Sequence, residues 1–212
     1  MKKIHNIKNI IFDLGAVVLD IDFEKTINAF KKLGIKDFEN IFTKAKQDKI
    51  FDEFERGELS DSQFREALRT LVGANLSEQQ IDDAWNAIII DFREEYIDLL
   101  RKVKNNYYTF LLSNTNSIHF KVYNNLLKKY GILDISELFH KVYLSYKIGM
   151  RKPERRIFQY LIEDSNLNPS ETLYIDDTYS YLCEAKSLGI NTVHFLPNMK
   201  LTDLFTDKGF LF

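Results

Sequence analysis

Short apolar segments alternate with amphipathic segments along most of the chain. Five of the apolar segments have the length of strands, and turn residues follow each of them. These predicted strands cover Asn9–Asp13, Tyr107–Leu112, Lys141–Ser145, Thr172–Asp176 and Asn191–Leu196. Helices are predicted over Glu94–Val103 and from starts near Ser117, Pro153 and Ser180. Strands that are apolar on both faces and alternate with helices are typical of a doubly wound, Rossmann-like α/β fold with a parallel sheet.

The stretch between the first two predicted strands has a different pattern. Its apolar residues recur at spacings of three and four, as in Phe64, Leu68 and Leu71, and no segment there has a convincing strand pattern. Ser60 and Ser77 each precede an acidic first turn with a glutamine three residues later, which indicates two helix starts. We therefore predict that this stretch is helical.

Such a long helical stretch divides the chain into two parts. Because a βαβ unit needs only about 30 residues, the surplus between the first two strands is an insertion. We predict an α/β core made of residues 1–20 and 93–212 and an all-helical cap domain made of residues 21–92. An insertion that follows the first strand would lie over the carboxyl ends of the strands, where open α/β sheets bind ligands. The cap could therefore close a pocket.

Composition and charge narrow the classes of partner and location. The chain has 212 residues, of which 45% are hydrophobic, so a disordered protein is excluded. A net charge of −2 argues against nucleic acid as the main partner. The longest aliphatic run, residues 87–90, is far shorter than the roughly 18 apolar residues that a membrane span needs. Cys183, the single cysteine, cannot form an intramolecular disulfide, which favours a cytoplasmic protein. It lies in an apolar helix pattern, so we expect its side chain in the core. Monomer and homodimer both stay open.

Acidic residues stand at the ends of two predicted strands. Asp13 ends the first strand, and Asp176 and Asp177 end the fourth. Carboxylates gathered in one crevice repel each other unless cations compensate, and a hard divalent ion with oxygen ligands does so best. With Lys152 nearby, three carboxylates and one Mg²⁺ would make a neutral site. Each acid taken alone is also explained as a turn cap or a frayed strand end.

Two further segments suit an anion. Ser113 and Asn114 follow the second strand where a helix begins, and a hydroxyl with backbone amides at a helix start can bind phosphate. Lys152 stands just before Pro153, which suits a first helical turn and would hold the ammonium in place. Ordinary helix capping and a solvated basic loop are the competing explanations.

Taken together, these residues resemble the haloacid dehalogenase-like (HAD) hydrolase superfamily over essentially the whole chain. The ordered set Asp13, Ser113, Lys152 and Asp176-Asp177 carries the resemblance. Within the family the chain is similar to a phosphatase branch with α-D-glucose-1-phosphate phosphatase and, more distantly, to the phosphatase domain of soluble epoxide hydrolases. The segments that support this are Phe12-Asp13-Leu14-Gly15, Leu19-Asp20-Ile21-Asp22-Phe23, Glu55-Arg56-Gly57-Glu58-Leu59-Ser60, Ser113-Asn114-Thr115-Asn116 and Gly149-Met150-Arg151-Lys152-Pro153-Glu154.

The resemblance implies a role for each residue. Asp13 would attack phosphorus and form an aspartyl-phosphate that water later hydrolyses. Ser113 would bind the phosphoryl group, and Lys152 would neutralise developing charge and orient Asp13. Substrate contacts would come from Ser113, Asn114, Lys152 and Glu55. Magnesium would be held by Asp13, the Gly15 carbonyl, Asp176 and Asp177, with Asp177 as a direct ligand.

Two positions depart from the family pattern. Family phosphatases usually carry a second Asp, the general acid and base, two residues after the nucleophile, where this chain has Gly15. General acid–base catalysis contributes about 10²–10⁴-fold, so another group would have to serve, and Asp20, Asp22 and Glu55 are the candidates. Tyr181 stands where relatives often have Asn near the metal.

Three functions stay open at this point. The first is a magnesium-dependent phosphatase of a small phosphorylated metabolite such as a sugar phosphate. The second is a 2-haloacid dehalogenase, and the third is a catalytically impaired phosphate-ester-binding protein, which Gly15 motivates. The cap aromatics Phe51, Phe54 and Trp85 could line a substrate chamber and His119 could border the pocket, although core packing explains such residues equally well.

Overall fold

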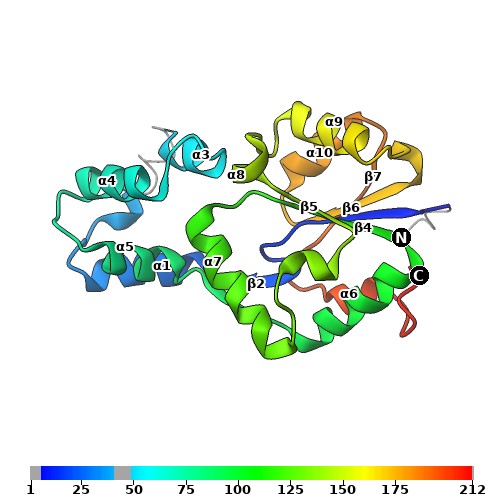
Figure 1. Ribbon diagram of the computed structural model, residues 1–212, viewed down its shortest axis with the longest axis horizontal. Coiled ribbons are helices and arrows are strands. Elements are labelled where there is room, and N and C mark those ends of the chain that lie inside the picture. The colour runs from blue at the N-terminus through cyan, green and yellow to red at the C-terminus, as the bar shows by residue number, and fades with distance from the viewer. Residues whose placement is uncertain (1–5, 41–48, 212) are drawn as a thin grey trace.

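The core is built on a five-stranded parallel sheet (Figure 1). The computed structural model describes residues 6–40 and 49–211. The strand order is β5-β4-β1-β6-β7. The strands are β1 (Asn9–Phe12), β4 (Tyr108–Ser113), β5 (Lys141–Leu144), β6 (Thr172–Asp176) and β7 (Asn191–His194). All five predicted strands are present, and each starts within a residue of its predicted first position.

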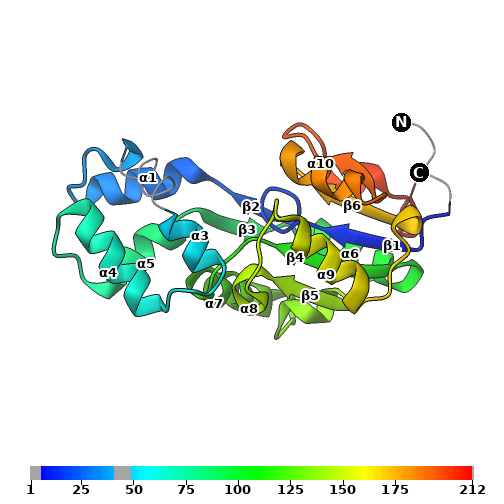
Figure 2. The same cartoon turned by 90° about the horizontal axis from the view of Figure 1, so that it is seen from above.

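Helices cover both faces of this sheet, because successive side chains of a strand point to opposite faces. Ile10 and Phe12 of β1 pack with α6 (Glu94–Asn106) and α7 (Ser117–Leu126). Ile11 packs on the other face with α9 (Arg155–Asp164) and α10 (Tyr179–Ser187). Figures 1 and 2 show the two layers of helices with the sheet between them. The predicted doubly wound α/β fold is confirmed.

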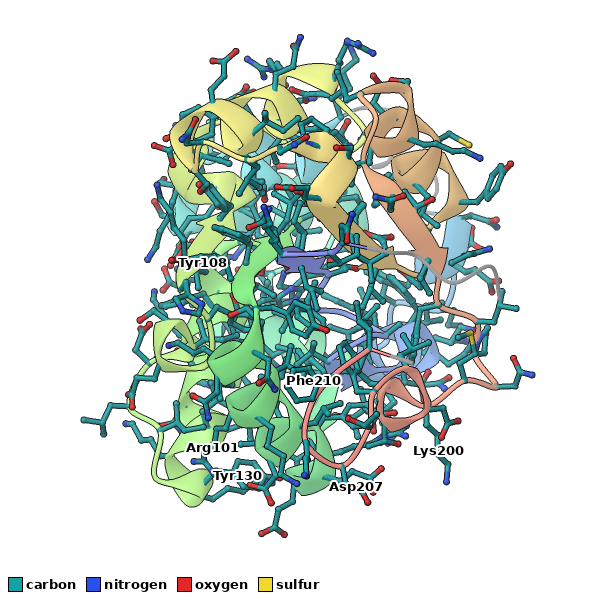
Figure 3. All side chains as sticks on the ribbon, turned by 90° about the vertical axis from the view of Figure 1, so that its right-hand side faces the viewer. Arg101, Tyr108, Tyr130, Lys200, Asp207 and Phe210 are labelled. Atoms are coloured by element: carbon teal, nitrogen blue, oxygen red, sulfur yellow. The ribbon has the colours of Figure 1, made fainter. Side chains whose placement is uncertain are left out.

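Short helical turns complete the core. They are α8 (Ser145–Ile148) and the 3₁₀ turns η1 (Leu127–Tyr130), η2 (Ile135–Leu138), η3 (Pro169–Glu171) and η4 (Leu201–Leu204). Figure 3 views the end of the core away from the cap, where Tyr108 and Phe210 are exposed. Among the described helices, none has the length and apolar character needed to cross a membrane.

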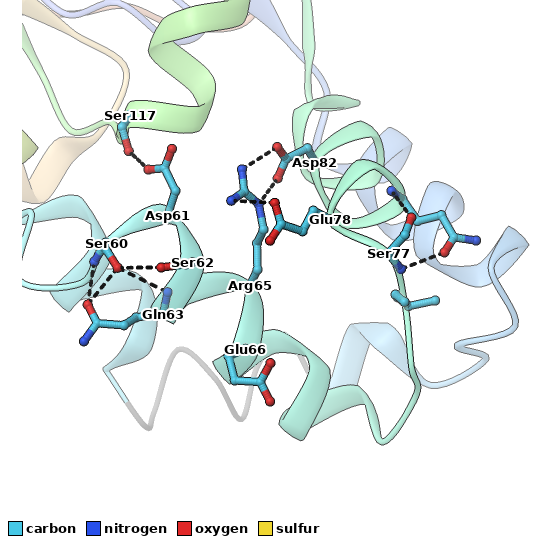
Figure 4. A network of polar contacts seen from close by, with 12 residues as sticks. Ser60, Asp61, Ser62, Gln63, Arg65, Glu66, Ser77, Glu78, Asp82 and Ser117 are labelled. Atoms are coloured by element: carbon cyan, nitrogen blue, oxygen red, sulfur yellow. Dashed lines mark hydrogen bonds and ion pairs between the residues drawn. The ribbon is translucent and has the colours of Figure 1, made fainter.

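The cap helices lie together on one side of the core (Figures 1 and 2). They are α1 (Phe23–Lys32), α3 (Ile50–Glu55), α4 (Asp61–Val72) and α5 (Glu78–Asn86). They bury a separate apolar cluster in which the rings of Phe54 and Phe64 stack at 3.9 Å. Ser60 and Ser77 both form the expected capping boxes, which Figure 4 shows.

Polar contacts hold the cap helices to one another and to the core (Figure 4). Arg65 of α4 donates to Asp82 of α5 at 2.7 Å. Asp61, at the start of α4, accepts hydrogen bonds from Ser117 and, at 2.7 Å, from Lys121 of α7. The acidic first turn of α4 therefore ties the cap to a core helix.

An antiparallel ribbon joins cap and core. β2 (Leu19–Ile21) pairs with β3 (Ile89–Phe92), although no strand was predicted between residues 22 and 92. The segment Ile89–Phe92 does not alternate apolar and polar residues, and only Phe92 in it is buried. Its pairing with β2 defines it as a strand. The ribbon lies at both predicted boundaries between core and cap. The exact boundaries, after residue 20 and after residue 92, stay a prediction.

Cys183 corrects another expectation. We expected this side chain in the core, but it is exposed on α10. That helix buries Leu182 and Ala185, which share one face at i and i+3, and Cys183 lies off that face.

Candidate active site

The strand ends bring three carboxylates together. Asp13 follows β1, and its N–H donates to the Ile175 carbonyl of the neighbouring β6 at 2.9 Å. Asp176 ends β6, and Asp177 follows it. One oxygen from each of Asp13, Asp176 and Asp177 lies within 4.8 Å of the others, so the group could hold a metal ion. Oxygen ligands are those that Mg²⁺ prefers.

Lys152 lies between two of these acids. Its ammonium donates to Asp13 Oδ1 at 2.7 Å, to Asp176 Oδ2 at 2.8 Å and to the Leu112 carbonyl at 3.1 Å. All three donors of the ammonium are therefore used, and the residue is 1% exposed. The Tyr181 ring lies 5.1 Å from Nζ, which adds a cation–π contact.

Burial and charge shift the pKa values of this group. Burial, opposed by the Lys152 ammonium, raises the pKa of Asp13 to about 7. Burial alone would lower the pKa of Lys152, but the charges of Asp13 and Asp176 raise it above its usual range. Burial and the Asp176 charge raise the pKa of Asp177. Three acids share one ammonium here, so a divalent cation would relieve their repulsion.

The two adjacent acids have different surroundings. Asp176 is fully buried, and its oxygens accept hydrogen bonds from the Thr178 N–H at 2.7 Å, from Lys152 and from the Tyr174 hydroxyl. Asp177 is the more exposed of the pair, and one of its oxygens accepts a hydrogen bond from the Thr178 hydroxyl at 3.2 Å. Asp177 is thus more accessible to an ion that arrives from solvent.

Ser113 ends β4, which pairs with β1 on the side opposite β6, and Asn114 follows it. Ser113 is 2% exposed, and its hydroxyl makes one long contact, 3.4 Å, with the Asn114 carbonyl. The Asn114 amide is occupied by the Lys152 backbone: Nδ2 donates to the Lys152 carbonyl at 2.9 Å, and Oδ1 accepts from the Lys152 N–H at 2.8 Å. Asn114 therefore fixes the loop that carries the ammonium.

A cavity of about 320 Å³ lies between this site and the cap. Gly15, Ser113 and Asn114 border it from the core, and Asp52 and Glu55 of α3 border it from the cap. Apolar cap and ribbon residues line the rest, among them Ile21, Phe23, Ile27, Phe51, Trp85, Ile88 and Ile89. Phe51 and Trp85 thus border the cavity, as the chamber hypothesis anticipated, whereas Phe54 packs in the cap cluster.

His119 borders the same cavity as a neutral side chain. Its Nε2 faces the Trp85 carbonyl at 3.2 Å, which can only accept, so Nε2 carries the hydrogen. Nδ1 faces the Asn116 amide nitrogen at 3.1 Å and accepts from it, because Asn116 Oδ1 already accepts the His119 N–H. Burial lowers the pKa of His119 to about 4.

Gly15, which stands where family phosphatases usually have the second Asp, faces the apolar side chain of Ile21. A Cβ added to Gly15 would lie 3.1 Å from Cδ1 of Ile21. Of the three candidate substitutes, Asp20 pairs with Arg93 at 2.8 Å, and Asp22 caps α1. Glu55 alone of the three borders the cavity, and burial raises its pKa.

Sequence reasoning assigned no role to Arg151 or Asp52. The Arg151 guanidinium donates to Glu55 at 2.9 Å and lies 3.1 Å from Asp52, so it joins the loop of Lys152 to the cap. The position of Arg151 next to Lys152 in the sequence could have suggested that it lies near the site. Its ion-pair partners, however, depend on how the cap packs against the core.

Comparisons with known proteins identify the family of this chain. The family described as haloacid dehalogenase-like hydrolase matches residues 10–195. The chain belongs to the haloacid dehalogenase-like hydrolases. Among relatives of this hydrolase, D-ribitol-5-phosphate phosphatase of Bacteroides thetaiotaomicron is 37% identical over 186 residues, which cover 88% of this chain and 90% of that protein.

Solved structures of HAD hydrolases align along most of the chain. An enzyme of the family from Bacteroides thetaiotaomicron, in complex with magnesium and inorganic phosphate, is 36% identical with a TM-score of 0.84, covering 94% of this chain and 100% of that one. A predicted family hydrolase from Porphyromonas gingivalis is 31% identical with a TM-score of 0.83, covering 93% and 95%. L-2-haloacid dehalogenase from Xanthobacter autotrophicus, 17% identical with a TM-score of 0.59, covers 88% and 76% and shares the fold alone.

Proposed function

We propose that this protein is a magnesium-dependent phosphatase that hydrolyses a small phosphorylated metabolite, and that the metabolite is a phosphorylated sugar or sugar alcohol. The convergence of Asp13, Lys152, Asp176 and Asp177 is the observation that carries this proposal. The relative that acts on D-ribitol 5-phosphate, similar along 88% of the chain, supports the substrate class.

The donor set fits magnesium. Asp13, Asp176 and Asp177 contribute three negative charges and Lys152 one positive charge, so a divalent cation makes the group neutral. Asp13, Asp177 and the Gly15 carbonyl would hold the ion, with Asp176 acting directly or through water. When bound, Mg²⁺ would polarise the phosphoryl oxygens and reduce repulsion between the anionic substrate and the anionic nucleophile.

The chain's own residues then carry the reaction. The Asp13 carboxylate attacks phosphorus, and the bond to the leaving oxygen breaks as that oxygen takes up a proton from water and departs as the alcohol. Water then hydrolyses the aspartyl-phosphate to the free Asp13 carboxylate and inorganic phosphate. Lys152 orients Asp13 through the 2.7 Å hydrogen bond and neutralises charge that develops on the phosphoryl group. The Ser113 hydroxyl binds a phosphoryl oxygen, and Asn114 holds Lys152 in place through its backbone.

The other two functions have weaker support. A dehalogenase does not need a cluster of three carboxylates, and the likeness to the haloacid dehalogenase extends only to the fold. A non-catalytic phosphate-binding protein would not require Asp13 and Lys152 in contact at the site. Halide release from a 2-haloacid without magnesium would favour the first alternative, and tight ester binding without turnover would favour the second.

The test is phosphate release from D-ribitol 5-phosphate and a panel of sugar phosphates, with Mg²⁺ and with EDTA. We expect turnover that needs Mg²⁺ and that falls by at least about 10³-fold in Asp13→Asn. Asp20→Asn is the matched control and should keep its activity, because Asp20 pairs with Arg93, does not border the cavity and lies outside the acidic cluster. Retained activity in folded Asp13→Asn would remove Asp13 from the role of nucleophile.

A further inference from the structure

The part of the cavity wall that α3 contributes is acidic. Asp52 and Glu55 of α3 border the cavity, and Arg151 is the one cationic side chain among the described residues that line it, because His119 is neutral. With both carboxylates ionised against the Arg151 guanidinium, these three side chains sum to a charge of −1. Arg56 lies outside the lining with its Nη2 3.9 Å from Asp52 Oδ2, and its charge is balanced by Glu154, which its Nε contacts at 2.7 Å. Lys152 does not change this sum, since its three donors are directed at Asp13, Asp176 and a carbonyl.

The charge of Arg151 is already shared by two carboxylates. Its Nε donates to Glu55 Oε2 at 2.9 Å, and its Nη1 lies 3.1 Å from Asp52 Oδ1. The three side chains are only 18–28% exposed, so solvent screens their charges weakly. Among the described residues of this wall, a carboxylate on the substrate would find no cation without a carboxylate partner, and it would face two like charges.

A hydroxylated, uncharged group meets suitable partners on the same walls. A carboxylate offers about four acceptor sites, and one contact to Arg151 leaves several on Glu55 for hydroxyl donors. Tyr123 also borders the cavity, is 1% exposed, and its hydroxyl makes no hydrogen bond of ordinary geometry within the described part of the chain. The stacked Phe51 and Trp85 rings, 5.2 Å apart, offer an apolar surface to a carbon chain.

We propose that Asp52 and Glu55 make the enzyme selective for phosphate esters of uncharged, hydroxylated alcohols, and that they reject esters whose organic part carries a carboxylate. The inference rests on the proposed phosphatase function and goes beyond it by assigning charge selection to two residues of α3. Like charges that face each other across an interface are strongly unfavourable, so we expect a preference of about 100-fold in kcat/KM.

Two substrate pairs isolate the charge. Glucitol 6-phosphate and 6-phosphogluconate differ at C1, where the alcohol is replaced by a carboxylate, and glycerol 3-phosphate and 3-phosphoglycerate form a shorter pair. The wild-type enzyme should prefer the uncharged member of each pair by about 100-fold. Glu55→Gln and Asp52→Asn should each narrow the preference to below about tenfold, chiefly through faster hydrolysis of the carboxylated member.

Glu53→Gln is the matched control, because Glu53 lies on the same helix and does not border the cavity. Its preference should equal that of the wild type. A gain on carboxylated substrates separates charge selection from a general-acid role for Glu55, since loss of an acid would slow both members of a pair. Circular dichroism confirms that each variant is folded, and the two separate variants allow the test to proceed if one is not.

The outcomes distinguish this inference from the proposed function. If the wild-type enzyme hydrolyses both members of each pair equally well, the inference is overturned and the phosphatase proposal stands. The inference is also overturned if the preference exists but neither Glu55→Gln nor Asp52→Asn reduces it. If p-nitrophenyl phosphate and both members of each pair remain intact with Mg²⁺, the phosphatase proposal itself fails.

Discussion

Replacing Lys152 by methionine tests the electrostatics of the site most directly. The substitution keeps an unbranched side chain of similar length but removes the ammonium that contacts Asp13 and Asp176. Both carboxylates then remain buried without that cation. Without metal, we expect the variant to be less stable than the wild type, and with Mg²⁺ we expect it to lose most phosphatase activity.

The hydrogen bonds of Lys152 determine how large the losses of stability and activity should be. Two of the three hydrogen bonds of Lys152 go to carboxylates, at 2.7 and 2.8 Å, and each such charged bond contributes about 1.5–3 kcal/mol. Removing one member of a buried ion pair costs about 3–5 kcal/mol. Relief of the cost of burying the ammonium itself offsets part of this, so we expect a loss near the lower end, about 3 kcal/mol. Loss of one group that stabilises transition-state charge costs about 10²–10³-fold in kcat.

Urea unfolding followed by circular dichroism in EDTA measures the free energy of unfolding, and phosphate release measures kcat. Lys186→Met on the exposed face of α10 is the control, which should stay within about 0.5 kcal/mol of the wild type. Added Mg²⁺ should stabilise Lys152→Met more than the wild type, because the ion replaces the missing positive charge. A Lys152→Met protein that loses less than 1 kcal/mol in EDTA would refute the reasoning.

Three further predictions concern other parts of the molecule. Gly57→Ala should destabilise the protein by at least about 1 kcal/mol more than Gly73→Ala in urea unfolding, because both glycines have positive φ but only at Gly57 would a Cβ lie 2.3 Å from a backbone carbonyl of α8; equal losses would contradict this. The pKa of His119 is lowered from 6.5 to about 4, so the unfolded state takes up the proton first and stability falls as the pH drops from 6.5 to about 4; His119→Phe should remove up to roughly 3 kcal/mol of this acid sensitivity, and an unchanged pH profile of unfolding would rule the cause out. Tyr174→Phe deletes the hydroxyl that donates to Asp176 and should weaken Mg²⁺ binding about tenfold in calorimetric titration, and unaltered affinity would show that the contact does not position the acid.

Much of the fold follows from local pattern. Most core strands are largely apolar, and polar residues stand at or directly after the ends of β1, β4, β5 and β6, so the positions of the strands were predictable to within a residue or two. The capping boxes at Ser60 and Ser77 likewise depend on neighbouring residues alone. The ribbon strand Ile89–Phe92 was missed because its pairing with a distant segment, not its own periodicity, forms it. Cys183 was misplaced because an apolar helix pattern does not fix which face is covered.

The candidate site also has features that the sequence predicts and features that it does not. Asp13 and Asp176 end adjacent parallel strands, so their proximity could be deduced once the parallel sheet was predicted. Asn114 was expected to contact substrate, and its engagement by the Lys152 backbone depends on a loop conformation that spacing does not specify. The ion pairs of Arg151 with the cap depend on how two separately folded clusters meet, which no single segment encodes.

Arg151 and Lys152 show how one loop can serve both parts of the molecule. Lys152 is directed at Asp13 in the core, whereas its neighbour Arg151 is directed at Asp52 and Glu55 in the cap. The acids that would hold the cation are thus separate from the acids that would face the organic part of the substrate. Substitutions in α3 can therefore alter which ester is accepted while the Asp13–Lys152 contact is kept, provided that Arg151 retains one carboxylate partner. If the two sets were a single network, Glu55→Gln would lower Mg²⁺ affinity as well as alter selectivity, and a magnesium titration of that variant distinguishes the two arrangements.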